Sequence, residues 1–141
     1  LTVDLPPEEA SDRVAILKHH GLDPIFLLAP TTPPARVAMI AKLASGYVYY
    51  VSLKGVTGAA HLDVASVAEK MAELRQNISL PIGVGFGIRD AASAAAVARV
   101  SDAVIIGSRI VQEAEQGKEG LAGRLEAFLS GVRQAVDAPR V

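Results

Sequence analysis

The sequence predicts an α/β fold that forms part of a (βα)8 TIM barrel, namely the C-terminal strands 4 to 8 with their helices, in a single domain of residues 1–141. Short apolar runs alternate with segments of helical periodicity along the chain, which is typical of parallel strands covered by helices. Two consecutive runs, at residues 80–90 and 101–110, each end in glycine directly before a helix. The predicted strands are a little over half of those in a closed barrel, which needs roughly 250 residues.

The first half of the chain supplies a strand remnant, two complete strands and two helices. Residues 1–7 begin without methionine and without a signal-peptide pattern, and they look like a strand already under way, so we expect the chain to be a fragment. In order, the predicted elements are a strand at 1–7, a helix over 10–20 that stops at Gly21, a strand at 24–30, a helix over 37–44 and a strand at 47–51 that is rich in aromatic and β-branched residues.

The second half repeats the pattern twice and then adds two helices. After a glycine-bearing loop at 54–60, Asp63 is suited to cap one helix, and Asp90 is suited to cap an alanine-rich one. In order, the predicted elements are a helix over 64–74, a strand at 80–84, a helix ending near Val100, a strand at 103–106, a helical turn from Ser108 and an amphipathic helix over 121–136. No linker, low-complexity tract or charge block indicates a second domain.

Composition excludes several classes of function. A net charge of -1 gives no electrostatic reason to bind nucleic acid or an anionic membrane. The chain has no cysteine, hence no disulfides, and no apolar run approaches the roughly 20 residues of a membrane span. We therefore expect a cytoplasmic protein whose partners are small molecules or other proteins. His19, His20 and His61 form no set with metal-ligand spacing, so no metal site is predicted.

Glycine-rich turns at the ends of strands form the candidate binding site. Glycine lets backbone N–H groups approach an anion because it has no Cβ, and a following helix adds its positive end. Each glycine alone is also explained by relief of strain in a tight turn, but their joint placement favours a phosphorylated substrate. The candidates for phosphate contact are Gly58, Gly87, Gly107 and Ser108, the last of which can also donate its hydroxyl.

Two aromatic residues and one carboxylate are further candidates. Strand alternation sends Tyr49 and Tyr47 to one face, where Tyr49 can line a pocket or be a core residue with its hydroxyl satisfied. Phe86, between two glycines, is expected to form a pocket wall. Asp4 is the carboxylate best placed at the barrel mouth, although it can equally bond a neighbouring loop.

A dinucleotide-binding fold is the first rival interpretation, because residues 83–87 contain three glycines. The spacing does not match G-x-G-x-x-G, and the acidic residue expected about 20 positions on belongs at a strand's end. Asp102 instead stands where a strand begins. This rival is therefore disfavoured.

Several segments together resemble the tryptophan synthase alpha chain family, in order and with matching spacing. The Gly-Val-Thr-Gly run at 55–58 is the sharpest of them. The matching segments are residues 4–9, 24–30, 46–52, 55–58, 85–88 and 102–108, spanning nearly the whole chain.

The resemblance implies a (βα)8 lyase of tryptophan biosynthesis that cleaves indole-3-glycerol phosphate to indole and glyceraldehyde 3-phosphate by a retro-aldol step. It implies phosphate binding by Gly58, Gly87, Gly107 and Ser108, and a mobile loop over residues 54–61 that closes the site. The residues expected to border the indole and glycerol parts are Leu1, Tyr49, Thr57 and Phe86.

The resemblance also implies what this chain lacks. The family's acid–base glutamate and aspartate belong to the N-terminal half of the barrel, and no residue here matches them, so we expect no catalytic residue in this chain and no activity from it alone. Leu53 departs from the basic residue that many relatives carry there. The expected partner is a beta subunit in an alpha2beta2 assembly, which holds pyridoxal phosphate, with no cofactor in this chain.

Two alternatives stay open. One is a stand-alone half-barrel that binds sugar phosphates without chemistry. The other is a different phosphate-binding barrel enzyme, such as an isomerase or aldolase. The second is disfavoured because the nearest candidate for a Schiff-base lysine, Lys54, lies in a loop rather than at a strand end.

Overall fold

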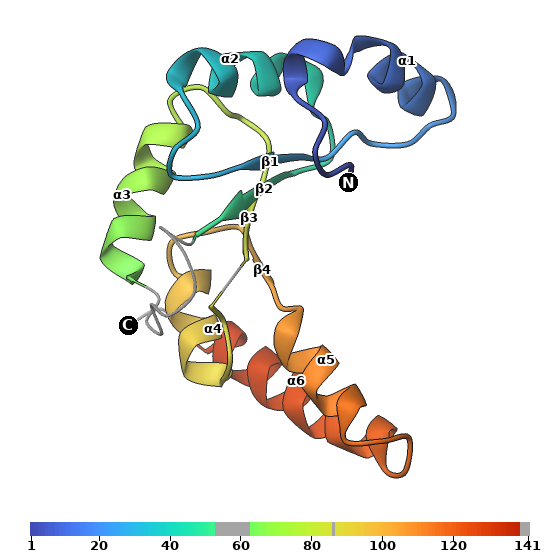
Figure 1. Ribbon diagram of the computed structural model, residues 1–141. Helices are drawn as coiled ribbons and strands as arrows, with labels where there is room; N and C mark the ends of the chain where they lie inside the picture. Colours follow the sequence, from blue (N-terminus) through green and yellow to red (C-terminus); the bar gives the residue numbers. More distant parts are fainter. Residues whose placement is uncertain (53–62, 86, 139–141) are drawn as a thin grey trace.

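A parallel sheet of four strands, with helices along one of its faces, organises the chain (Figure 1). The computed structural model describes residues 1–52, 63–85 and 87–138. The strand order is sequential and every neighbouring pair is parallel. The strands are β1 (Phe26–Leu28), β2 (Val48–Val51), β3 (Ile82–Gly85) and β4 (Ala103–Ile105). Sequential order with helical crossovers is the arrangement of consecutive units in a (βα) barrel, so the predicted fold class is confirmed.

The helices follow the predicted order. They are α1 (Ser11–His19), α2 (Pro34–Leu43), α3 (Val64–Leu74), α4 (Ala91–Ala98), α5 (Ser108–Glu115) and α6 (Leu121–Asp137), preceded by a 3-10 turn, η1 (Pro7–Glu9). Within the three described ranges, none of these helices is long and apolar enough to cross a membrane.

The core lies between the helices and one face of the sheet. Strand register places Phe26 beside Val48, and Val48 beside Ile82, so these three side chains form one row. A second row contains Leu28, Tyr50 and Val84. All six residues are buried, and they belong to one apolar cluster with side chains from α2, α3 and α4. Val132 and Val136 of α6 pack against the same cluster.

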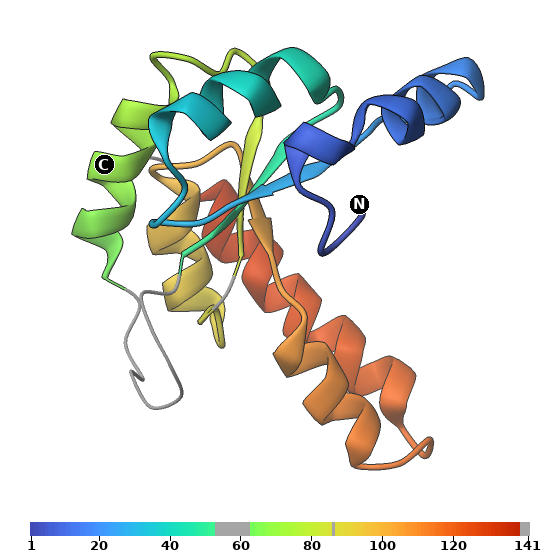
Figure 2. The same cartoon turned by 45° about the horizontal axis from the view of Figure 1, so that its top comes forward.

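The opposite face of the sheet carries no helix among the described residues, as the rotated view shows (Figure 2). Helices α2, α3, α4 and α6 curve around the first face only. The open face displays the alternate residues of each strand, including the row Leu27, Tyr49 and Gly83. In a (βα) barrel this face is the barrel's interior, while the helices form the outer ring.

Aspartates cap two of the helices, as predicted. Asp63 Oδ1 accepts a hydrogen bond from the Ser66 amide at 3.2 Å, at the start of α3. Asp90 Oδ1 accepts from the Ser93 amide at 2.7 Å, and the Ser93 side chain accepts in turn from the Asp90 amide at 3.2 Å. This reciprocal pair satisfies amides that the first turn of a helix leaves without partners. These contacts hold the Asp90 pKa below its usual value, mainly through the hydrogen bond from the Ser93 amide.

The amino-terminal ends of β3 and β4 are joined by a carboxylate. Asp102 Oδ2 accepts from the Ile82 amide at 2.8 Å and from Arg75 Nη2, also at 2.8 Å. The Ile82 residue is completely buried, so this bond satisfies an amide that water cannot reach. Asp102 thus sets β4 beside β3 at the end of the sheet opposite the candidate site.

One element of the prediction is wrong. Residues 1–7 form no strand: Asp4 has a φ of 56°, which is the left-handed region, and Pro7 begins η1. A strand needs a hydrogen-bonded neighbour, and prolines supply no N–H for one. Leu129, an apolar residue of the predicted amphipathic helix over 121–136, is 48% exposed, in an open groove between α6 and the edge strand β4.

Candidate functional site at the carboxyl edge of the sheet

Two of the predicted phosphate-binding glycines occupy equivalent places on neighbouring strands. Gly85, the last residue of β3, is the register partner of Ile105, the last residue of β4. Gly87 and Gly107 each come two residues after a member of this pair. Both turns therefore leave the same edge of the sheet, the carboxyl edge at which (βα) barrels carry their active sites.

Gly107 stands directly before α5 and leaves the start of this helix open. Its carbonyl oxygen accepts from the amides of Ile110, at 2.9 Å, and Val111, at 3.1 Å, so the first helical turn is already formed. Gly107 and Ser108 are exposed, and a Cβ placed on Gly107 would meet no atom within 4 Å. The first amides of a helix have no intrahelical acceptor and carry the positive end of its dipole, so this end can receive an anion.

The turn after β3 requires glycine at Gly87. Its φ is 76°, in the left-handed region that residues with a Cβ rarely adopt. The next residue, Ile88, is buried in the core, and Asp90 then caps α4. The left-handed residue therefore lies in the short turn that links the end of β3 to the start of α4.

Glycines in β3 make room for side chains of the neighbouring strands on the open face. A Cβ on Gly85 would lie 2.0 Å from the Tyr49 hydroxyl oxygen, and a Cβ on Gly83 would lie 2.9 Å from Cδ1 of Ile105 in β4. The Tyr49 ring thus leans across Gly85, the Ile105 side chain lies over Gly83, and both glycines are buried. Burial raises the Tyr49 pKa, and the neighbouring Tyr47 raises it further. Together these rings give the open face a mainly apolar floor.

Ser52 secures the carboxyl end of β3. Both its amide, at 3.1 Å, and its hydroxyl, at 2.9 Å, donate to the Gly85 carbonyl oxygen. The ladder between β2 and β3 is therefore extended by one residue beyond the last strand pair, Val51 and Gly85. Ser52, the residue after β2, therefore holds in place Gly85, over which the Tyr49 hydroxyl lies.

The structure places only some of the predicted site residues. Tyr49 lies half-buried on the open face, as alternation predicted, and Leu1 is 59% exposed at the N-terminal end. Gly58, Thr57 and Phe86, with the loop at 54–61, lie outside the described residues. The assignments of all these residues to phosphate or pocket stay predictions. Asp4 is exposed in its left-handed turn.

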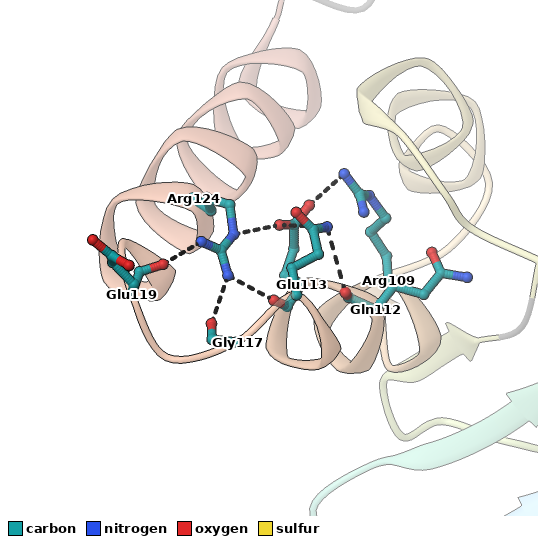
Figure 3. A network of polar contacts seen from close by, with 7 residues as sticks. Arg109, Gln112, Glu113, Gly117, Glu119 and Arg124 are labelled. Carbon is teal, nitrogen blue, oxygen red and sulfur yellow. Dashed lines mark hydrogen bonds and ion pairs between the residues drawn. The ribbon is translucent and has the colours of Figure 1, made fainter.

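A polar network beside the site was not found from the sequence. Glu113 of α5 is buried and lies between Arg109 of the same helix and Arg124 of α6 (Figure 3). The spacing of Arg109 and Glu113, four residues apart in a helix, is a signal that was available, since such pairs face each other. Among the described residues, no group of three or more His, Asp or Glu side chains is arranged to hold a metal ion.

The sheet topology and the glycine turns at its carboxyl edge define part of a (βα)-barrel protein, with its candidate site where barrel enzymes carry theirs. The family profile described as "Tryptophan synthase alpha chain" matches residues 1–137. The chain therefore belongs to the tryptophan synthase alpha chain family.

Curated relatives and solved structures agree with this assignment. The tryptophan synthase alpha chain of Laribacter hongkongensis is 60% identical over 138 residues, which are 98% of this chain and 52% of the relative. That of Chromobacterium violaceum is 70% identical over 115 residues, 82% of this chain and 44% of the relative. Crystal structures of the alpha subunit from Legionella pneumophila (TM-score 0.81) and of Mycobacterium tuberculosis tryptophan synthase (TM-score 0.82) are both 36% identical, and cover 97% and 96% of this chain.

The same matches define how much of a family member is present. This chain spans 51% of the Legionella pneumophila chain and 50% of the Mycobacterium tuberculosis chain. It therefore covers about half the length of the relatives and structures that it matches, in keeping with a partial barrel.

Proposed function

We propose that this chain is the C-terminal half of a tryptophan synthase alpha chain and that it binds the phosphate of indole-3-glycerol phosphate. The complete protein would cleave this substrate to indole and glyceraldehyde 3-phosphate by a retro-aldol reaction. The observation that carries the proposal is the pair of glycine turns, at Gly87 and Gly107, that leave one sheet edge beside the exposed start of α5.

In the complete protein, the C-terminal half would bind the substrate and the N-terminal half would supply the proton-transfer groups. Backbone amides at Gly87, Gly107 and Ser108, with Gly58, would hold the phosphate, and Tyr49 with Leu1, Thr57 and Phe86 would border the indole and glycerol parts. Fixing the two ends of the substrate places the carbon–carbon bond that breaks between proton-transfer groups. Those groups are the glutamate and aspartate of the N-terminal half, so this chain alone supplies binding and no catalysis.

The proposed partners follow from the same assignment. In the complete protein, the alpha chain would pass indole to a beta subunit that carries pyridoxal phosphate, within an alpha2beta2 assembly. The likeness to solved structures of Mycobacterium tuberculosis tryptophan synthase supports this proposal.

Calorimetric titration of the chain with glycerol 3-phosphate tests the binding function. Gly107→Val is expected to weaken binding at least tenfold, because a branched side chain would occupy the space that the phosphate needs. The structure makes the variant informative, since a Cβ at Gly107 meets no protein atom within 4 Å and the fold need not change. Gly123→Val, at an equally open position on α6, is the matched control and should bind like the parent. Equal affinities for Gly107→Val and the parent would overturn the assignment.

A second assay addresses catalysis. The chain alone should release no indole from indole-3-glycerol phosphate, and mixing it with the separately produced N-terminal half of a relative should restore release. Measurable turnover by the chain alone would show that its own residues supply the acid and base.

A further inference from the structure

Helix α5, which begins at the proposed phosphate site, packs through a buried charged residue, Glu113. Glu113 is the one buried residue of α5, all of whose residues are described, and it is only 4% exposed. Helices α1 to α4 bury apolar side chains instead, such as Val67, Met71 and Leu74 of α3. The position of α5 therefore depends on how a buried carboxylate is satisfied, because an unpaired buried charge is costly.

Two arginines satisfy Glu113 from two helices. Arg109, one turn earlier in α5, forms an ion pair with Glu113 Oε1, and its guanidinium carbon lies 5.4 Å from the centroid of the Phe128 ring of α6. Arg124 of α6 donates from Nε to Glu113 Oε2 at 3.1 Å. Gln116 adds a bond to Oε2 at 3.3 Å. The carboxylate is thus shared between α5 and α6 (Figure 3).

Arg124 also fixes the segment that joins the two helices. Its Nη2 donates to the carbonyl oxygens of Glu113, at 2.9 Å, and Gly117, at 2.8 Å, while its Nη1 donates to that of Glu119 at 2.6 Å. One planar guanidinium therefore holds the end of α5, the connecting segment and the start of α6 together. A lysine has a single ammonium and cannot reproduce this fork of donors.

The anchor lies at the opposite end of a short helix from the proposed phosphate contacts. Helix α6 packs on the core through Val132 and Val136, so it is a fixed support for α5. Glu113 stands five positions after Ser108, which is about 7.5 Å along a helix of 1.5 Å rise per residue. A tilt or rotation of α5 at Glu113 would therefore displace the amides of Gly107 and Ser108.

We propose that Glu113 is a positioning residue for phosphate binding, which holds α5 against α6, through Arg109 and Arg124, so that the Gly107 and Ser108 amides converge on the anion. This inference rests on the proposed phosphate-binding function. It assigns a role in ligand affinity to a carboxylate that does not touch the ligand.

The direction in which one substitution changes the affinity for phosphate distinguishes a positioning role of Glu113 from a purely electrostatic effect. Glu113→Gln removes a negative charge near the bound anion, so Coulomb's law alone predicts tighter phosphate binding. Positioning predicts weaker binding, because Arg109 and Arg124 bind different oxygens of Glu113, and glutamine is neutral and replaces one of these acceptors with an NH2 donor. Glu115→Gln is the matched control, since Glu115 is an exposed carboxylate at the end of the same helix.

The test is calorimetric titration of the full 141-residue chain with glycerol 3-phosphate, accompanied by amide NMR spectra of the same samples. We expect Glu113→Gln to weaken binding about tenfold, because small displacements of binding groups have effects of this size or more. Arg124→Lys, which keeps the charge, should also weaken binding, and Glu115→Gln should bind as well as the parent or better. The unliganded Gly107 and Ser108 resonances should shift in Glu113→Gln, while those of Val84 in the core stay in place.

Each other outcome has a definite meaning. If the parent does not bind, the proposed function fails and the inference with it. If the parent binds and Glu113→Gln binds equally or more tightly, the inference alone is overturned. If the Val84 resonance is also lost in Glu113→Gln, Glu113 supports the whole fold rather than the position of α5, and the inference is again overturned.

Discussion

The hydroxyl group of Tyr49 fills the space in which a side chain of Gly85 would stand. A Cβ on Gly85 would lie 2.0 Å from the Tyr49 oxygen and 2.5 Å from its Cζ, both closer than real Cβ contacts. β2 and β3 are therefore matched on the open face, with a large residue on one strand leaning over a glycine on the next. This fit sets the shape of the surface on which we place the indole ring.

Gly85→Ala should destabilise the chain. The added methyl group must displace the Tyr49 ring, and overpacking of this kind costs about 1–3 kcal/mol. The free energy of unfolding in urea measures this loss. Gly123→Ala on α6 is the control and should stabilise slightly, because alanine favours a helix and the site is open.

We attribute the expected loss of stability in Gly85→Ala to the Tyr49 ring, and a second substitution tests this cause. In a Tyr49→Leu background, the penalty of Gly85→Ala should shrink, since the shorter side chain no longer reaches the glycine. Equal penalties in the two backgrounds would show that the alanine acts elsewhere.

Alkaline pH should lower the stability of the chain partly through Tyr49. Burial, and then the nearby Tyr47, raise the pKa of Tyr49 above the value of 10.0 that it has when unfolded. The folded state therefore keeps the proton longer, and the free energy of unfolding falls as the pH rises through about 10. Tyr49→Phe should reduce this slope between pH 9 and about 11 in urea titrations. Burial also raises the Tyr50 pKa, so part of the slope should remain. An unchanged slope in Tyr49→Phe would contradict the assignment.

Removing Asp102 should cost more than removing its arginine partner. Asp102→Ala leaves the buried Ile82 amide without its carboxylate acceptor, which costs about 1–3 kcal/mol. Arg75→Gln removes only an ion pair that is well exposed on both sides, worth about 0–1 kcal/mol. Chemical denaturation of the two variants gives the comparison, and equal losses would indicate that the ion pair, not the amide, is what Asp102 stabilises.

Ser108→Ala should weaken binding of glycerol 3-phosphate about two- to thirteenfold, the equivalent of one hydrogen bond of about 0.5–1.5 kcal/mol. The hydroxyl is exposed at the start of α5, where it can donate to a phosphate oxygen. Calorimetry measures the change, with Ser130→Ala, at an exposed position on α6, as a control that should have no effect. A Ser108→Ala chain that binds as tightly as the parent would restrict the site to backbone amides.

Local patterns explain why much of the fold could be predicted. The caps at Asp63 and Asp90, the start of a helix at Ser108 and the face on which Tyr49 lies follow from residues close in sequence. The strand expected at residues 1–7 was wrong, because a strand depends on a neighbour that local periodicity does not reveal. The hydrogen bond from Arg124 to Glu113 was not predicted for the same reason, because it joins two helices and local periodicity does not reveal which residues of different helices meet.

The candidate site was predictable only as a set of turns. Glycine after an apolar run indicates a strand-to-helix turn, and the structure puts the turns of Gly87 and Gly107 at equivalent positions on adjacent strands. The fit of Gly85 to the Tyr49 ring, and of Gly83 to Ile105, was not predicted, because it depends on which strands are neighbours and in which register. The roles of Gly58, Thr57 and Phe86 stay predictions.

Phosphate binding at the carboxyl edge of the sheet is tested most directly by an NMR titration of the 15N-labelled chain with glycerol 3-phosphate, in which the backbone amides are followed one by one. A single phosphate site at this edge predicts saturable shifts, with a common dissociation constant, at the amides of Gly87, Gly107 and Ser108, and no shift at Ile82 on the opposite edge. Amides of Gly87 and Gly107 that do not respond, or that respond with different affinities, would contradict a single phosphate site at this edge of the sheet.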